Sequence, residues 1–137
     1  MDEMNKIWDP LRKKDVALTP EEKVRQLFIS FMQSTMKIPY HMMMSEVGFK
    51  LGQKKFRADI LVYDRHARPL AVVECKRPQV NIDKEVLMQA IRYNMVLDVK
   101  YIIITNGNST FMFCKKGKTA AEGYSPVLKV PVYEDML

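Results

Sequence analysis

The sequence predicts an α/β fold in which a mixed β-sheet is flanked by helices. Three observations support this prediction. A capped amphipathic helix begins at Thr19, strand-like segments extend from Met42 to Lys76, and a second helix after Pro78 precedes the apolar run 101–105. The order of helix, three strands, helix and further strands is typical of one sheet covered by helices.

The first helix has a strong start signal. Thr19 is expected as its N-cap and Pro20 as its first residue, with Glu22 reaching back as the second half of a capping box. The helix should extend to about Met36. Its expected apolar stripe consists of Val24, Leu27, Phe28, Phe31 and Met32.

The middle of the chain predicts three strands. Residues 42–49 are expected to form a strand, and a basic loop through Gly52 leads into two further strands around the turn formers of 64–69. These two strands read as a hairpin. If its turn is centred between His66 and Ala67, the strands pair residue by residue around that point.

The remaining elements follow in order. Asn81 or Asp83 can cap a helix that lasts to about residue 98. Residues 101–105 predict a buried strand, 106–109 a hairpin turn and 110–114 another strand. Residues 127–132, which Pro131 interrupts, are at best an edge strand.

Length and composition are those of one folded domain. The chain has 137 residues, of which 47% are hydrophobic, and only 5 Gly and 7 Pro, which argues against disorder. We expect residues 1–18 to form an N-terminal arm without an assigned function, which could pack through Ile7, Trp8 and Leu11. Residues 19–137 should form a single domain.

The chain is basic. Its 22 Lys and Arg against 16 Asp and Glu leave a net charge of +6, which favours a polyanionic partner, with nucleic acid as the first candidate. The basic side chains cluster within 12–14, 50–57, 76–77 and 115–118. For any single cluster, ordinary solubilising surface charge explains the pattern equally well.

Cysteine usage and hydropathy bear on the compartment. Cys75 and Cys114 have neither a CxxC spacing nor a disulfide framework, and we expect buried thiols in a reducing compartment. The charged N-terminus lacks a following apolar segment, and no stretch reaches the roughly 18 apolar residues that a membrane span requires. The expected location is cytoplasmic, without membrane contact.

Two acidic residues and a lysine on the predicted hairpin carry the chemistry. The predicted pairing places Asp59 opposite Glu74, with Lys76 two residues further on and on the same face. Carboxylates roughly 5 Å apart repel by about 3 kcal/mol at an effective dielectric near 20. A divalent cation such as Mg²⁺ relieves this repulsion, as does protonation of one carboxyl. The pattern therefore indicates a metal-dependent phosphodiesterase site.

A bland alternative stands beside this interpretation. Glu and Lys two residues apart on an exposed strand are usually solvated surface residues. Here, however, Glu74 follows the apolar run 70–73 and Asp59 opens another one, so both charges lie at the ends of buried strands. This context favours the paired site.

At these residues the chain resembles the PD-(D/E)xK, or restriction-endonuclease-like, superfamily. More narrowly, it resembles the N-terminal nuclease domain of type I restriction enzyme R subunits. The likeness covers roughly 19–113 and rests on five segments in order, 19–26, 57–60, 73–78, 89–93 and 101–107. One departure is Ala58, which stands where a proline often precedes the first acidic residue.

The resemblance implies a restriction-endonuclease-like core and a set of roles. Asp59, Glu74 and the backbone carbonyl of Cys75 would bind Mg²⁺, or Mn²⁺ in its place. Lys76 would orient or activate the attacking water and offset charge on the phosphate. Glu22 would support the metal or its waters, with the capping box as the alternative explanation.

Four further residues are expected to contact the substrate. Gln89 and Tyr93 match a QxxxY element, lie one helical turn apart and should look toward the core or the cleft. A buried Gln with a hydrogen-bonded Tyr could also be purely structural. Arg25 could hold Glu22 or a phosphate, and a simple i,i+3 pair explains it equally well. Arg77 adjoins the ExK motif.

The resemblance has a limit in size. Type I R subunits continue into a helicase motor, but residues 48–54 lack the spacing and the Ser or Thr of a phosphate-binding GxxxxGK[ST] loop. We therefore expect no ATP-driven translocation here, and a free-standing nuclease-like domain.

Three functions remain open. The first is an Mg²⁺-dependent endodeoxyribonuclease, and the second is a nucleic-acid-binding module that has lost turnover or depends on a partner. The third is an interaction domain whose basic surface is incidental. The sequence leaves open DNA against RNA, and whether the domain forms a homodimer or binds a partner protein.

Overall fold

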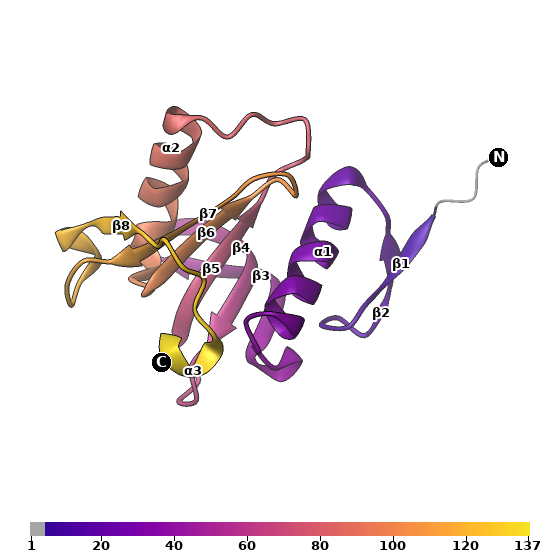
Figure 1. The fold of residues 1–137 in the computed structure, drawn as a ribbon, viewed down its shortest axis with the longest axis horizontal. Coiled ribbons are helices and arrows are strands. Elements are labelled where there is room, and N and C mark those ends of the chain that lie inside the picture. Colours follow the sequence, from indigo (N-terminus) through magenta and orange to yellow (C-terminus); the bar gives the residue numbers. More distant parts are fainter. Residues whose placement is uncertain (1–4) are drawn as a thin grey trace.

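The computed structural model describes residues 5–137, and its centre is a six-stranded mixed sheet (Figure 1). Neighbouring strands are antiparallel except for the parallel pair β5 and β6. The strand order is β3 (Met43–Leu51), β4 (Lys54–Tyr63), β5 (Pro69–Cys75), β6 (Tyr101–Thr105), β7 (Thr110–Lys115) and β8 (Tyr124–Pro126). The predicted mixed sheet flanked by helices is confirmed.

Two helices cover opposite faces of this sheet. Helix α1 (Pro20–Ser34) packs on one hydrophobic cluster, which includes Ile60 and Val73. Helix α2 (Lys84–Asn94) packs on a second cluster, which includes Leu61 and Val72. Because consecutive strand residues point to opposite faces, the continuous apolar runs of the central strands supply both layers.

Helix α1 begins as predicted. The side chain of Thr19 accepts a hydrogen bond from the backbone N–H of Glu22 at 3.1 Å, and Pro20 is the first helical residue. Val24, Phe28 and Met32 are buried, but Leu27 is 59% exposed and was wrongly placed in the apolar stripe. Ile29 takes the buried place because the sheet contacts that side of the helix.

Helix α2 is capped by Asp83, the second of the two candidates, whose carboxylate accepts the N–H of Val86 at 2.9 Å. The short 3₁₀ helix η2 (Met95–Leu97) continues it to Asp98, where a left-handed backbone (φ 53°) ends the segment. Two further 3₁₀ helices are η1 (Tyr40–Met42) and η3 (Ala120–Glu122). The turn predicted at 106–109 joins β6 to β7.

The predicted C-terminal edge strand was assigned to the wrong residues. The edge strand is β8, and residues 127–132 leave the sheet after Val127 donates its N–H to Met112. Helix α3 (Tyr133–Met136) follows. Its Tyr133 donates its N–H to the carbonyl of Met36 at 2.7 Å and its hydroxyl to that of Tyr63 at 2.7 Å. These contacts hold the chain end beside α1 and the sheet rather than along its edge.

The N-terminal segment forms a sheet of its own, in which β1 (Lys6–Asp9) pairs antiparallel with β2 (Lys14–Ala17) beside α1 (Figure 1). Leu11 packs on the main core, as expected, whereas Trp8 is 57% exposed. Residues 1–4 of the predicted arm lie outside the described residues, and the division at residue 18 stays a prediction. Within residues 5–137, no helix has the length and apolar character that crossing a membrane requires.

Candidate active site

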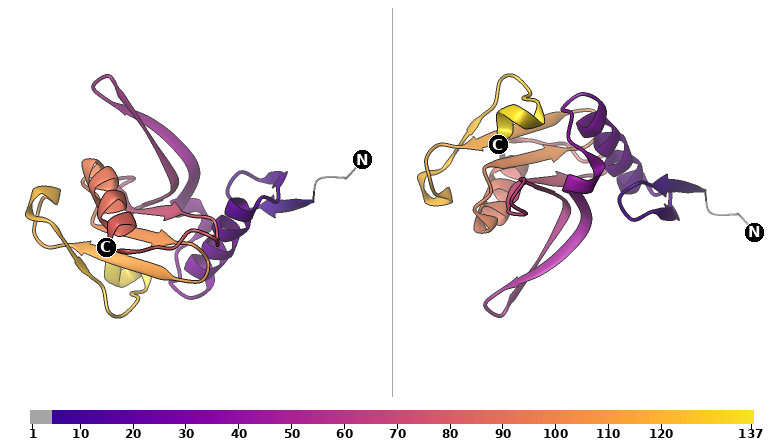
Figure 2. Two further views of the ribbon diagram at one scale, coloured as in Figure 1. Left: turned by 90° about the horizontal axis from the view of Figure 1, so that it is seen from above. Right: turned by 90° about the horizontal axis from the view of Figure 1, so that it is seen from below.

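The predicted hairpin exists, and its strands separate at the acidic residue. The register Ile60↔Val73, Leu61↔Val72 and Val62↔Ala71 is the predicted one, but the β4–β5 ladder stops at Ile60. Residues 54–58 of β4 pair only with β3. The β3–β4 hairpin therefore leaves the sheet and stands out from it (Figure 2). Asp59 lies at the resulting fork.

A backbone distortion on the neighbouring strand marks the same place. Glu46 has a left-handed φ of 51° in the middle of β3 and lies opposite Asp59, where the ladder skips one pair. Ala58 and Ile60, two residues apart, accordingly pack in different hydrophobic clusters. A non-glycine residue in this region costs about 1–2 kcal/mol. Such strain occurs preferentially at functional sites.

The carboxylate of Asp59 bridges elements from both sides of the fork. Its Oδ2 accepts the backbone N–H of Cys75 at 2.7 Å, and its Oδ1 lies 3.4 Å from the guanidinium of Arg25. Burial raises the pKa of Asp59, and the nearby Glu74 raises it further, against the opposing effects of the Cys75 N–H and Arg25. The two carboxylates therefore interact unfavourably.

Glu74 and Lys76 form a close pair beside α2. Lys76 Nζ lies 2.7 Å from Glu74 Oε2, and the amide of Asn94 donates to Glu74 Oε1 at 3.0 Å. Both side chains line an open pocket of ≈ 490 Å³ between the end of β5 and α2. The amine is thus placed beside one acidic residue of the predicted site.

Gln89 and Tyr93 line the same pocket, so the predicted pair faces the cleft. Gln89 is exposed, which excludes the alternative of a buried structural glutamine. The hydroxyl of Tyr93 accepts the backbone N–H of Arg57 at 3.2 Å, and its ring packs against Phe56 at 5.4 Å between centroids. Tyr93 therefore also ties α2 to the projecting hairpin.

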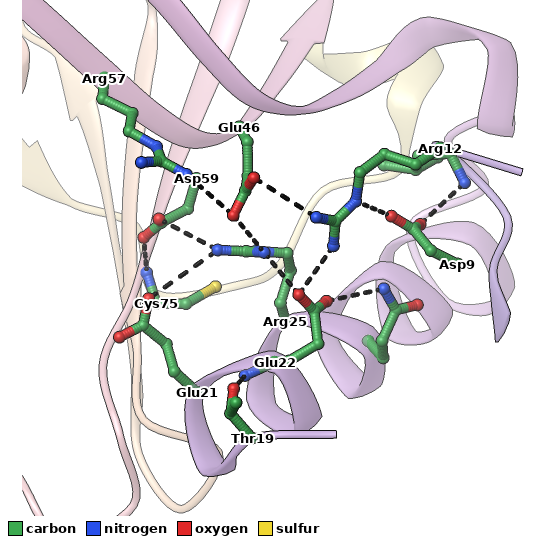
Figure 3. Close-up of polar contacts among 12 residues, drawn as sticks. Asp9, Arg12, Thr19, Glu21, Glu22, Arg25, Glu46, Arg57, Asp59 and Cys75 are labelled. Atoms are coloured by element: carbon green, nitrogen blue, oxygen red, sulfur yellow. Dashed lines mark hydrogen bonds and ion pairs between the residues drawn. The ribbon is translucent and has the colours of Figure 1, made fainter. Parts of the chain in front are cut away.

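Glu22 does not complete the capping box. Its carboxylate binds Arg12 and Arg25, both at 2.7 Å, and accepts the side-chain amide of Gln26 at 2.9 Å (Figure 3). Two guanidinium groups outcompete the helix N-terminus for this buried carboxylate because they carry full charge. Glu22 reaches Asp59 only through Arg25.

Arg25 holds Glu22, the first of the two roles expected of it. Its guanidinium also lies 3.2 Å from Glu46 and 3.8 Å from Glu21. The side chain is only 4% exposed, which is too little for contact with a DNA phosphate. Its pKa is raised, because the surrounding acids, Glu22 first, outweigh the effect of burial.

Several residues of this centre had not been singled out. Glu46 contacts three arginines, Arg12, Arg25 and Arg57, and they hold its pKa below the usual range although burial alone would raise it. Arg12 also binds the fully buried Asp9, which ties the N-terminal sheet to the site (Figure 3). Apart from the Asp9–Arg12 pair, which is three residues apart, these contacts join residues far apart in sequence, so no local pattern marks them.

Asn94 is a missed residue for which the sequence offers a signal. It is buried and also donates to the carbonyl of Ala90, one turn earlier on the same face of α2. A polar side chain on the apolar face of a helix needs a partner. The sequence does not say that this partner is Glu74.

The remaining predicted residues are placed as follows. Cys75 is buried, and burial raises the pKa of its thiol, whereas Cys114 is half-buried. Arg77 is exposed next to Lys76. Within residues 5–137, no three side chains of His, Cys, Asp or Glu are grouped as a metal centre. The expected ligands comprise only two carboxylates and a backbone carbonyl.

Comparison with known proteins identifies relatives among type I restriction enzymes. Residues 20–131 match the family described as the type I restriction enzyme R protein N terminus. Over 66 residues the chain is 42% identical to the type I restriction enzyme EcoAI endonuclease subunit of Escherichia coli. That alignment covers 48% of this chain and 8% of the subunit.

Two solved structures share the fold. A fragment of a protein described as the HsdR subunit of a type I restriction enzyme from Vibrio vulnificus superposes with a TM-score of 0.59 at 20% identity, over 87% of this chain and 24% of that chain. A protein described as a nuclease of the DUF820 family from Anabaena variabilis gives 0.52 at 12% identity, over 94% and 82%.

The chain thus spans a small part of the E. coli subunit and about a quarter of the Vibrio chain. The family match, in contrast, spans most of this chain. The protein therefore belongs to the family of type I restriction enzyme R protein N termini and has its restriction-endonuclease-like fold.

Proposed function

We propose that this domain is a metal-dependent nuclease that hydrolyses DNA phosphodiester bonds, with Asp59, Glu74 and Lys76 as its catalytic residues. The observation that carries the proposal is the fork between β4 and β5, where Asp59 binds the residue that separates Glu74 from Lys76. The Glu74–Lys76 pair opens into a pocket large enough for a phosphate.

The oxygen donors at the fork fit a hard divalent cation. Mg²⁺ takes one or two carboxylates and keeps waters and substrate phosphate oxygens in its shell, which matches two acids rather than a full protein cage. The mutual repulsion of Asp59 and Glu74 is the kind that a cation relieves. The carbonyl of Cys75 is the proposed third donor, because the N–H and C=O of a strand residue point the same way and its N–H faces Asp59.

The bound cation and the side chains of the site would have separate catalytic roles. When bound, the cation supplies Lewis-acid polarisation of the phosphate and lowers the pKa of a bound water. Glu74 holds the ammonium of Lys76 at 2.7 Å, and this positive charge offsets the negative charge that builds up on the phosphate as water adds to phosphorus. As the water oxygen bonds to phosphorus, the bond between phosphorus and the leaving oxygen breaks; the water gives up a proton to solvent, and the leaving oxygen takes one from solvent.

Other residues would position the substrate and the site. Gln89 and Tyr93 line the same pocket as Glu74 and Lys76 and would contact the DNA backbone. Arg77, exposed and next to Lys76 in the chain, would contact it as well. Glu22 would act through Arg25, because Arg25 lies between it and Asp59. It is therefore proposed as a positioning residue rather than a ligand.

A second function is favoured by one specific observation. Every carboxylate oxygen of the two acids already has a partner: Arg25 and Cys75 for Asp59, and Asn94 and Lys76 for Glu74. A site whose carboxylate oxygens all have partners within the chain is also expected of a nucleic-acid-binding module that has no catalytic turnover. If cleavage instead depends on a partner protein or a second copy, that partner would have to rearrange the fork first.

Plasmid nicking separates these functions. We expect supercoiled DNA to be nicked with Mg²⁺ or Mn²⁺, and chelation to abolish the reaction. Asp59→Asn, Glu74→Gln and Lys76→Met should each lower the rate by about a hundredfold or more, the loss typical of a removed transition-state contact. Glu85→Gln, an exposed acid on the same helix as the pocket wall, is the matched control and should keep full activity.

Metal binding by calorimetry provides a second readout. Asp59→Asn and Glu74→Gln should weaken Mg²⁺ or Mn²⁺ binding, whereas Lys76→Met should not. Nicking that persists in all three site variants would overturn the assignment. Salt-sensitive DNA binding without nicking by the wild type would support the second function instead.

A further inference from the structure

The projecting end of the β3–β4 hairpin, residues 48–57, is rich in cationic side chains. Between Gly48 and Arg57 it contains Lys50, Lys54 and Lys55 as well as Arg57, all exposed, and no Asp or Glu. Arg57 pairs with Glu46 at 2.9 Å. In the described part of the chain, the three lysines have no carboxylate within ion-pair distance. The hairpin extends away from the rest of the sheet (Figure 2), and its four cationic side chains are exposed.

The register brings like charges together on this hairpin. Lys50 lies directly opposite Lys55, and Gly48 opposite Arg57, so these cations share one face of the ribbon. Like charges directly opposite each other destabilise a strand pair. An anion laid across this face would remove the repulsion, which gives the arrangement a reason in binding that it lacks in folding.

The aromatic side chains of the hairpin point to phosphate rather than base contacts. Phe49 and Phe56 stack on each other at 5.6 Å between centroids, and Phe56 is further covered by Tyr93 and by the ammonium of Lys54. Single-stranded nucleic acids bind through free aromatic faces on which bases stack. Because the Phe56 ring is already packed, the chemistry of this surface matches the backbone of a duplex.

The hairpin is continuous with the candidate active site through Tyr93. A hollow of ≈ 520 Å³ is lined by Lys50, Lys55 and Arg57 together with Tyr93. A smaller one of ≈ 250 Å³ is lined by Lys54, Arg92 and again Tyr93. Tyr93 also lines the pocket of Glu74 and Lys76. A backbone lying along the hairpin therefore passes next to that pocket.

We propose that the β3–β4 hairpin is an arm that binds the phosphate backbone of double-stranded DNA and places it at the Glu74–Lys76 pocket. This rests on the proposed function in one respect: DNA is the substrate of that pocket. The hairpin lysines are substrate-positioning residues and take no part in bond cleavage.

The test compares two triple variants of the full chain with equal loss of charge. Lys50→Gln, Lys54→Gln and Lys55→Gln together remove the arm's lysines. Lys116→Gln, Lys118→Gln and Lys129→Gln remove three exposed lysines in and beyond the β7–β8 region, at the opposite edge of the sheet. Circular dichroism and thermal unfolding check that both fold as the wild type does.

Binding of a fluorescent duplex is measured over a series of salt concentrations. The arm variant should bind at least tenfold more weakly, and the slope of log K against log salt should fall by about 0.9 for each phosphate that the arm no longer neutralises. The control variant should keep the slope and affinity of the wild type. Equal binding by the wild type and the arm variant would overturn the proposal.

Two competing probes refine the result. A single-stranded oligonucleotide or polyglutamate that binds the arm more tightly than the duplex does would also overturn it. A wild type that binds duplex through the arm, yet never nicks it with any metal, leaves the arm standing and removes the nuclease. If the arm variant nicks DNA at the wild-type rate, the arm is overturned and the nuclease stands.

Discussion

The carboxylate of Asp59 accepts the backbone N–H of Cys75 at 2.7 Å, across a fork at which their two strands no longer pair. This bond replaces the next rung of the β4–β5 ladder with a side-chain contact. It fixes the first acidic residue to the residue between Glu74 and Lys76. The geometry of the proposed site thus depends on the same bond that closes the end of the sheet.

Replacing Asp59 should separate these structural and chemical roles. Asp59→Ala leaves the Cys75 N–H without an acceptor and should lower the free energy of unfolding by about 1–3 kcal/mol. Asp59→Asn keeps an acceptor oxygen and relieves the repulsion with Glu74, so it should lose less. Urea unfolding at neutral pH measures both. Equal stability of the two variants would contradict this explanation.

The two acids facing each other across β3 and β4 should titrate in opposite directions. Carbon-detected NMR should place the pKa of Asp59 above its ordinary value, because of burial and of Glu74. It should place the pKa of Glu46 below its ordinary value, because Arg25, Arg57 and Arg12 outweigh burial. A shared direction of shift would contradict this charge network.

The lowered pKa of Glu46 has a consequence for acid stability. Its stabilising effect is present above the pKa of the unfolded chain and is lost as the pH falls through the lower folded value. Glu46→Gln should therefore be less stable than the wild type at neutral pH, and the difference should shrink on acidification. Unfolding curves of the wild type and the variant across that acid range measure this. A difference in stability that does not change with pH would contradict an ionic effect.

Arg25 should matter far more for stability than Arg57. Arg25→Met leaves Glu22 buried with one guanidinium partner fewer and should cost about 3–5 kcal/mol, the usual result of breaking a buried pair. Arg57→Met breaks an ion pair at a residue that is 64% exposed and should cost at most about 1 kcal/mol. Chemical denaturation of both variants provides the comparison, and similar losses would refute it.

Replacing the two residues of the QxxxY element should affect different properties of the protein. Gln89→Ala changes an exposed side chain that lines the pocket, so the melting temperature should stay the same while nicking slows. Tyr93→Phe removes the acceptor for the Arg57 N–H and should also cost about 0.5–1.5 kcal/mol. Thermal unfolding and nicking rates measured side by side test this division. A destabilised Gln89→Ala would point to a structural role for the glutamine.

The tip of the β4–β5 hairpin offers a stabilising change. Ala67 has a left-handed φ of 60°, a conformation that costs an L-residue about 1–2 kcal/mol and glycine almost nothing. Allowing for the greater freedom of unfolded glycine, Ala67→Gly should stabilise the protein by about 0.5–1 kcal/mol. Ala121→Gly, at an exposed residue without this backbone, should destabilise it. The same sign for both would contradict the explanation.

Local chemistry explains why so much of the fold was predictable. The Thr19 cap, the Asp83 cap and the 106–109 turn depend on side chains within a few residues of the backbone groups that they bind. The register of β4 and β5 follows from the short turn that joins them, because the turn of a hairpin fixes which residues face each other. The failures at Leu27 and at residues 127–132 arose where packing partners distant in sequence decided the outcome.

By itself, the sequence determined the order of elements, the pairing of the hairpin and the presence of two acids and an amine at strand ends. Only the tertiary structure decided which charges meet. Glu22 leaves its helix terminus for Arg12 and Arg25, Glu46 enters the site through a strained backbone, and Asn94 reaches Glu74 from another layer. The physical reason is that a buried charge takes whichever opposite charge the packed layers bring near it, and that choice is not encoded in local spacing.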